Sequence, residues 1–251
     1  MIYNIVAHEC RRLFKTGKIF ILLALCQCLL GLIFHCLLSE FQYKIQAAIL
    51  EPTLSLGLME NLLHPLFAWN ALIFLFITPL LAAQSFSQER KSHTLVLYFS
   101  APLSALNLVL GKVIGLILGH LFLLLPLILM TLFLALQQPL DLGHLFAASC
   151  GLFAFMSANI ALSIMVSCAS KDPTICMLMS FVLVLFLSLL EWLAPLWDSS
   201  LEYWAHFSTL YHCKSLLSGL LNTQALIYYL LLIGTCLCFS VLRLEKECDF
   251  Q

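Results

Sequence analysis

Long apolar runs, broken by short polar stretches, dominate this sequence. The charge-free runs are 19–39, 61–88, 92–111, 113–140, 142–170, 173–190 and 215–242. A helix needs roughly 20 mostly apolar residues to cross about 30 Å of hydrocarbon. Six of the runs meet this requirement, whereas 92–111 carries several polar residues and a proline. The pattern therefore predicts an all-α polytopic membrane protein with six transmembrane helices.

The composition supports the same class. The chain has 251 residues, of which 62% are hydrophobic and 10% charged, and its mean hydropathy is +1.02. A soluble domain carries about a quarter charged residues. The formal net charge of −1 provides no general basic field of the kind that attracts nucleic acid. We therefore expect the lipid bilayer as a partner and no nucleic acid.

The positions of Lys and Arg predict the orientation, because cytoplasmic loops collect these residues. We predict a single transmembrane domain over 1–251, with spans at 19–38, 63–86, 106–136, 144–169, 174–194 and 225–242. With both termini inside, only Lys44 and Lys214 lie outside. The other ten lie inside, namely Arg11, Arg12, Lys15, Lys18, Arg90, Lys91, Lys112, Lys171, Arg243 and Lys246. A seventh span over 92–111 would place five outside, so six spans fit better.

Three segments between or before the spans have distinctive patterns. Residues 1–18 place apolar side chains at near-helical spacing around Arg11, Arg12 and Lys15, which predicts an interfacial amphipathic helix with its apolar side in the headgroups. The alternative is a basic flank that only sets topology. The cytoplasmic loop 87–105 contains a short helix that ends before Pro102. The aromatic outer segment 195–222 is expected to re-enter the membrane as short helices.

Few residues inside the spans offer chemistry. Asn70 in the second span is expected to face a neighbouring helix, Glu191 lies near the outer end of the fifth, and the small residues of the fourth span predict close helix packing. The chain has no Walker A sequence and no GxSxG elbow. Its eleven cysteines contain no CxxC pair and are interpreted as packing residues. No metal site is predicted; His206 and His212 are the one pair considered as haem or metal ligands.

The stretch 85–112, SFSQERKSHTLVLYFSAPLSALNLVLGK, carries a recognisable motif. Its pattern consists of Phe86, Glu89, Arg90, Thr94, Leu95, Leu97, Pro102, Leu110, Gly111 and Lys112. This phrase resembles the loop after the second span in permeases of the type-2 ABC exporter family. His93 and Tyr98 depart from the residues usual at those positions. The C-terminal part, including His206-Phe207, Ser218-Gly219, Tyr228-Tyr229 and 241–245, resembles the gliding-motility branch of that family.

The resemblance implies a function that the residues alone do not reveal. The chain would be the permease subunit of an ATP-driven exporter in the bacterial cytoplasmic membrane, without a nucleotide site of its own. It would pair with a second permease chain and two cytoplasmic ABC ATPase subunits, which bind the ATP and Mg²⁺. The segment 195–222 would form an outer gate, with Tyr203, Trp204, His206, Phe207 and Tyr211 as its candidate residues. Asn70 and Glu191 would be the polar candidates for the transport path.

The same resemblance makes the loop 87–105 a coupling helix that docks on the ATPase. Its candidate contact residues are Glu89, Arg90, Lys91, Thr94, Leu95, Leu97 and Pro102, and Gly111 and Lys112 close the loop into the third span. Charged residues suit charge-assisted contacts with a partner, and leucines suit apolar docking. The alternative is an ordinary solvated loop whose basic residues only set topology.

Other functions remain open at this point. One is a haem-handling subunit of the cytochrome-maturation type, suggested by the histidines near the outer face. Another is an ABC-type scaffold whose motion drives the assembly of a surface machine. An intramembrane enzyme is disfavoured because no catalytic set of residues can be placed on one face.

Overall fold

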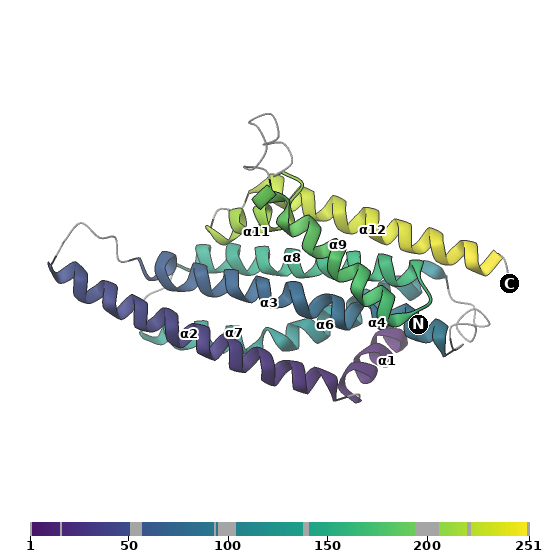
Figure 1. The fold of residues 1–251 in the computed structure, drawn as a ribbon, viewed down its shortest axis with the longest axis horizontal. Helices are drawn as coiled ribbons and strands as arrows, with labels where there is room; N and C mark the ends of the chain where they lie inside the picture. Colours follow the sequence, from purple (N-terminus) through teal and green to yellow (C-terminus); the bar gives the residue numbers. More distant parts are fainter. Residues whose placement is uncertain are drawn as a thin grey trace.

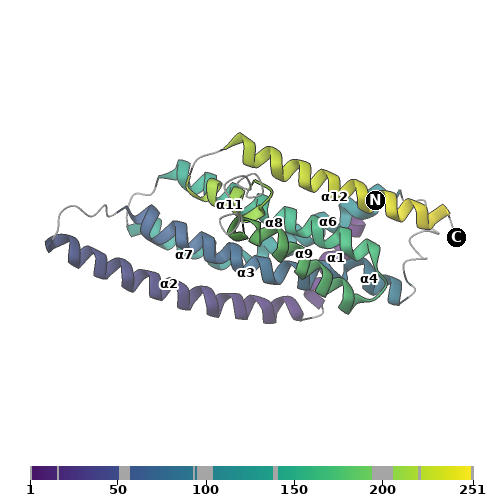
Figure 2. The same ribbon diagram turned by 45° about the horizontal axis from the view of Figure 1, so that its top comes forward.

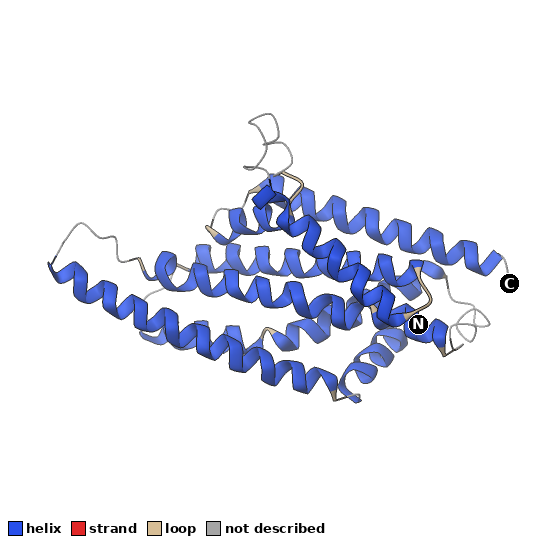
Figure 3. Cartoon of the chain, in the orientation of Figure 1, coloured by secondary structure: helices blue, strands red, loops and turns tan. Residues whose placement is uncertain are grey.

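The computed structural model describes residues 2–15, 17–50, 57–92, 94, 104–137, 141–193, 206–219 and 222–249. The secondary structure of these residues consists of helices, with no strands (Figure 3). The elements are α1 (Ile2–Lys15), α2 (Lys18–Leu50), η1 (Met59–Leu63), α3 (His64–Ala82), α4 (Gln84–Lys91), α6 (Ala105–Leu123), α7 (Leu125–Gln137), α8 (Leu142–Ala169), α9 (Pro173–Leu193), α11 (Thr209–Leu217) and α12 (Thr223–Asp249).

Six helical segments among the described residues are long and apolar enough to span a membrane. They are Ile19–Gln46, Met59–Lys91, Ala105–Leu123, Leu142–Ala169, Pro173–Trp192 and Thr223–Glu247. This confirms the predicted all-helical, six-helix class. The long helices run roughly along one direction, and the two termini lie at the same end of the bundle (Figure 1). We call this the α1 end, because α1 crosses the bundle there.

The centre of the bundle is α8, which packs against α3, α6, α9, α11 and α12 (Figures 1 and 2). Small residues at its contact face, including Ala148, Gly151, Ala158 and Ala161, are buried and let neighbouring helices approach. By contrast α2, α9 and α12 expose many large apolar side chains along their outer faces. The burial pattern therefore sorts the bundle into a packed centre and a surface suited to hydrocarbon.

Two helices differ from the sequence expectation in extent. The first long helix continues through Leu50 instead of ending near residue 38, so Glu40 and Lys44 lie on the helix and form an ion pair at 2.9 Å, four residues apart. Such pairs support an exposed helix. The third span, expected over 106–136, divides at Leu124 into α6 and α7, because Pro126 has no N–H to continue the hydrogen-bond ladder.

The second span and the following loop form an almost continuous rod. The π-helical turn η1 leads into α3, and after a single turn residue, Ala83, the chain continues as α4. Ala83 itself keeps α-helical backbone angles. The start of the expected cytoplasmic loop is therefore a direct extension of the membrane helix.

α1 packs against α6 through a stripe of glycines. Gly111, Gly115 and Gly119 recur every fourth residue along α6. A Cβ atom added at these glycines would lie 2.8, 2.7 and 2.9 Å from Ile5, Glu9 and Leu13 of α1, respectively. Side chains four apart share a helix face, so both stripes are continuous. The two backbones thus approach as closely as glycine allows.

This packing shows which part of α1 the protein covers. Ile5 and Leu13 are each 7% exposed and face α6, so this part of the apolar side of α1 is buried against another helix. The position of α1 at the membrane surface stays a prediction. The face opposite α6 remains polar, with Arg11 and Lys15 exposed. The helix is amphipathic as the sequence indicates, but its inner face is covered by protein.

The glycine stripe predicts a position-dependent effect of adding one methyl group. Gly→Ala within a helix is intrinsically favourable by roughly 0.5–1 kcal/mol. In Gly115→Ala this gain should be outweighed by overpacking against Glu9, which typically costs about 1–3 kcal/mol. The thermal midpoint of the purified protein in one detergent should therefore fall.

Gly234→Ala on α12 is the matched control, because nothing lies within 4 Å of the added Cβ. Its midpoint should stay equal or rise. A Gly115→Ala midpoint no lower than that of Gly234→Ala would contradict the close approach of α1 and α6.

Candidate functional site

The glycine stripe brings a carboxylate into the interior at the α1 end. Glu9 is 1% exposed and lies over Gly115, next to Lys112, which is also 1% exposed. The Lys112 Nζ lies 2.6 Å from Glu89 Oε1 on α4 and 3.7 Å from Glu9 Oε2 on α1. It also donates to the Ser85 carbonyl at 2.9 Å. One ammonium group thus joins three helices.

A second cation completes this cluster from the α1 side. Arg12 pairs with Glu9 Oε1, and its Nη1 donates to the Ser85 carbonyl oxygen at 3.2 Å. The Ser85 hydroxyl donates to Glu9 Oε1 at 3.0 Å. We call Glu9, Arg12, Ser85, Glu89 and Lys112 the ion cluster. Its two carboxylates and two cations balance in charge, which is the condition for burying such groups at tolerable cost.

The surroundings of the cluster hold α4 in place. The Lys112 Nζ lies 4.7 Å from the ring centroid of Phe86, within the range of a cation–π contact. The backbone N–H groups of Phe86 and Ser87 donate to the Ser167 hydroxyl of α8, at 3.0 and 3.1 Å. The first-turn N–H groups of a helix lack partners within that helix. Ser167 supplies one and so fixes α4 to the central helix.

The far end of α4 is tied to the C-terminal helix. Arg90 forms an ion pair with Glu247 of α12 at 2.8 Å, and the Arg90 side chain is 7% exposed. α4 therefore contacts α1 and α6 through the ion cluster, α8 through Ser167 and α12 through Arg90. No other described element of this length is bound to so many neighbours by polar contacts.

The predicted coupling residues divide between interior and surface. Glu89 and Arg90 point inward to Lys112 and Glu247, while Lys91 is exposed. Thr94 is exposed, and both its N–H and its hydroxyl donate to the Glu89 carbonyl, at 3.0 and 3.3 Å. Leu95, Leu97 and Pro102 lie outside the described residues. Of the predicted coupling residues that the structure describes, only Lys91 and Thr94 are exposed to a partner.

The two polar candidates for a transport path lie on different helices and have different surroundings. Asn70 is 1% exposed on α3, and its Oδ1 has no hydrogen-bond partner among the described residues. Glu191 lies near the end of α9 and pairs with Lys214 of α11 at 3.0 Å. The structure does not bring the two together, and Glu191 instead fixes α11 to α9.

The outer segment is described from His206 onward, and Tyr203 and Trp204 lie outside the described residues. His206, Phe207 and Tyr211 are exposed. α11 is capped by the Ser208 hydroxyl, which accepts from the Tyr211 N–H at 3.4 Å. Polar contacts at 2.6–3.1 Å connect this segment to α9 and α12, namely Tyr228 to Phe207, Tyr229 to Thr209, Ser188 to Thr209 and Ser208 to Ser188.

His206 and His212 do not form a ligand pair. The Nε2–H of His212 donates to the carbonyl oxygen of His206 at 2.8 Å, and the ring stacks on Tyr228 with centroids 4.2 Å apart. Burial lowers the pKa of His212, which favours its neutral form. This histidine is engaged as a packing and hydrogen-bonding residue of α11.

Three potential metal ligands do meet at the ion cluster. One ligand atom each from His8, Glu9 and Glu89 lies within 4.8 Å of the others. Lys112 and Arg12 already neutralise the two carboxylates, so a divalent cation would meet two positive charges at close range. We therefore assign the group to the ion cluster and not to a metal.

The sequence motif contained only part of this site. It included Glu89 and Lys112 but not Glu9, Arg12, Ser85 or Ser167. The signal for the missing half was the Gly-x-x-x-Gly-x-x-x-Gly spacing that begins at Gly111, near the end of the motif. It matches a stripe of side chains with the same spacing in 1–18. Glu9, a lone acid in a basic amphipathic helix, marks the inward face.

The fold and the site define a polytopic helical membrane protein with a polar cluster at one end. A family model described as "ABC-2 family transporter protein" matches residues 3–210, so the chain belongs to this family. It is accordingly a permease component of an ABC transporter, a class that associates with an ABC ATPase. A comparison with curated proteins gives no match. The likeness of the C-terminal part to the gliding-motility branch stays a prediction.

The ion cluster predicts strong non-additivity between Lys112 and Glu89. Lys112→Met leaves two buried carboxylates facing one arginine, and breaking a buried pair in this way costs about 3–5 kcal/mol. Adding Glu89→Gln restores the charge balance. The double variant should therefore have a higher thermal midpoint and a higher detergent-extracted yield than Lys112→Met alone. Additive losses would contradict a direct Lys112–Glu89 pair.

Cys10 reports on the same interface through its titration. Its Sγ lies 3.8 Å from the Gly115 carbonyl, and burial together with the negative charge of Glu9 raises its pKa. The rate of Cys10 alkylation can be followed by peptide mass spectrometry as the pH is raised. The pH at which this rate reaches half of its maximum should be higher in the folded protein than in protein unfolded in dodecyl sulfate. Glu9→Gln should lower the folded midpoint, while burial keeps it above the unfolded one. Equal folded and unfolded midpoints would refute this environment.

Proposed function

We propose that this chain couples ATP hydrolysis on a separate ABC ATPase to the export of a substrate across a bacterial cytoplasmic membrane. In this proposal the α1 end faces the cytoplasm, with both termini inside. Two ATPase subunits and a second permease chain complete the transporter, and ATP and Mg²⁺ bind only to the ATPase. The family membership and the predominance of Lys and Arg at this end support the orientation.

The observation that carries the proposal is the position of α4. It continues the α3 helix at the α1 end, exposes Lys91 at its own end and Thr94 just beyond it, and is bound on its inner side to α1, α6, α8 and α12. A force on the exposed side would act on all four helices together. This is the mechanical requirement for passing a movement of the ATPase to the membrane helices.

Within this scheme the ion cluster is a positioning element rather than a docking surface. Glu89 Oε1 accepts a hydrogen bond from Lys112 inside the protein. The Glu89 carboxylate therefore has a partner within the chain and does not need one on the ATPase. The charge that α4 presents outward is that of Lys91. We infer that an acidic or polar groove on the ATPase receives Lys91, Thr94 and the loop that follows them.

Asn70 and Glu191 keep separate roles in this proposal. Asn70, buried in the α3 rod with an unpaired carbonyl oxygen, is suited to contact a substrate group or a second permease chain when the helices move. Glu191 with Lys214 positions the outer segment, where His206, Phe207 and Tyr211 would form part of an outer gate.

The coupling proposal predicts that surface charge and buried charge have different effects. Affinity-tagged permease from native membranes should co-purify an ABC ATPase, identified by its Walker A peptide. Lys91→Glu reverses a rim charge and should weaken this association about fivefold or more at unchanged thermal stability of the permease. Glu89→Gln should instead lower the thermal midpoint, because it leaves Lys112 short of a partner.

Lys246→Glu is the matched control, since it makes the same charge change on an exposed residue of α12 at the same end. It should leave the association unchanged. Equal losses for both variants would show a general charge effect and remove the special role of α4. Recovery of no ABC ATPase with the unaltered chain would refute the coupling proposal as a whole.

A further inference from the structure

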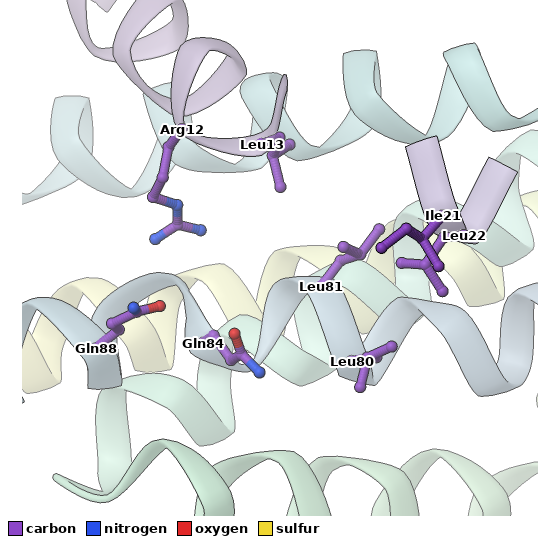
Figure 4. Close-up of a pocket in the computed structure, with 8 residues that line it drawn as sticks. All are labelled: Arg12, Leu13, Ile21, Leu22, Leu80, Leu81, Gln84 and Gln88. Atoms are coloured by element: carbon purple, nitrogen blue, oxygen red, sulfur yellow. The ribbon is translucent and has the colours of Figure 1, made fainter. Parts of the chain in front are cut away.

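A second feature of the α1 end is a cleft with one polar end and one apolar end. It lies between α1, the start of α2 and the α3–α4 rod, and has a volume of about 310 Å³. Arg12, Gln84 and Gln88 form the polar end, as Figure 4 shows. Ile21, Leu22, Leu80 and Leu81 form the apolar end, with Leu13 between the two groups.

The order of these residues follows the direction of the rod. Gln88, Gln84 and Leu80 are four apart and therefore lie on one face of the α3–α4 helix. At 1.5 Å per residue the distance from Gln88 to Leu80 is about 12 Å along the axis. The lining of the cleft thus changes from polar at the end of the bundle to apolar toward its middle. The length of this change is comparable to that of a lipid headgroup and the first part of an acyl chain.

The cleft opens sideways to the surroundings of the bundle. The side chains at its apolar end include Ile21, 73% exposed, and Leu80, 38% exposed. Both belong to helices long and apolar enough to span a membrane. Large apolar side chains at this depth would face hydrocarbon rather than water. A ligand that reaches the apolar end therefore enters from the bilayer.

The polar end is positively charged. Arg12 also lines an adjoining shallow hollow with His8, Arg11 and Lys15, and Arg11 and Lys15 are exposed. Among the described residues that line the cleft and the hollow, none is acidic. Glu9, the acid that balances Arg12, lies behind it in the ion cluster. An anionic group is thus attracted to the mouth of the cleft, where arginine is suited to bind phosphate.

We propose that this cleft binds one anionic phospholipid from the leaflet at the α1 end. The phosphate would lie at Arg12 with Gln88 as a hydrogen-bond donor, and one acyl chain would lie along Ile21, Leu22 and Leu80. The charge of the mouth selects an anionic head, and the apolar end requires a chain. The ligand would bridge α1, α2 and the α3–α4 rod beside the ion cluster. On its other side, α1 is held by the close packing of the glycine stripe of α6.

The test uses the full-length permease purified in detergent and titrated with dioleoyl-phosphatidylglycerol, with bound lipid counted by native mass spectrometry. The proposal predicts one tightly retained lipid per chain, a weaker retention of dioleoyl-phosphatidylcholine, and no displacement by glycerol phosphate. Equal retention of the two lipids would overturn the anionic selectivity. Displacement by glycerol phosphate would overturn the role of the acyl chain.

Two variants locate the site without touching the ion cluster. Gln88→Glu places a negative charge at the exposed mouth and should weaken phosphatidylglycerol binding about fivefold, the factor expected for about one charge near an anionic headgroup. Ile21→Trp should fill the apolar end and reduce binding at unchanged thermal stability in lipid-free detergent. The proposal fails if neither variant reduces binding.

Matched controls separate the cleft from general surface effects. Lys171→Gln removes an exposed positive charge from the turn between α8 and α9, and Leu29→Trp enlarges an exposed apolar residue of α2 outside the cleft. Both should bind phosphatidylglycerol like the unaltered chain. Losses in the controls equal to those in the cleft variants would identify a nonspecific lipid annulus and overturn the site. The assay needs no ATPase, so its outcome is independent of the coupling proposal.

Discussion

The α1 end of this permease depends on the burial of one ammonium group. Lys112 is 1% exposed, and an unpaired charge in such a place would cost several kcal/mol. Its partners come from α1 and α4, so the three helices must meet for the charge to be accommodated. The glycine stripe makes this possible, because only an α6 without side chains on that face allows Glu9 close enough to Lys112. Packing and electrostatics here are parts of one constraint.

This constraint gives α4 two unlike faces. Its inner face carries Ser85, Glu89 and Arg90 into contacts with α1, α6 and α12. Lys91 at its end and Thr94 just beyond it are exposed. Glu89, Arg90 and Lys112 are paired inside the protein, so Lys91 is the charged residue of α4 that remains exposed. The buried charges of Glu89 and Arg90 fix where α4 lies, and the charge of Lys91 stays exposed.

The two ends of the bundle are held together by different kinds of interaction. The α1 end uses buried, charge-balanced ion pairs. The opposite end uses hydrogen bonds between neutral groups, such as Tyr229 to Thr209, and exposed or partly exposed pairs, such as Lys214 with Glu191. Exposed pairs contribute about 0–1 kcal/mol. Breaking the polar contacts around α11 is therefore expected to be less costly than breaking those around α4.

The sequence by itself determined the class and the number of spans, because hydrocarbon imposes length and apolarity on every spanning helix. It also marked the stretch 85–112 through the motif with Glu89 and Lys112. Only the tertiary structure decided what these two residues touch. Glu9 lies on a helix that the sequence alone assigned to the membrane surface, and its approach to Lys112 depends on two stripes from distant segments facing each other. Periodicity specifies a face of a helix, whereas the partner of that face follows from the packing of the whole chain.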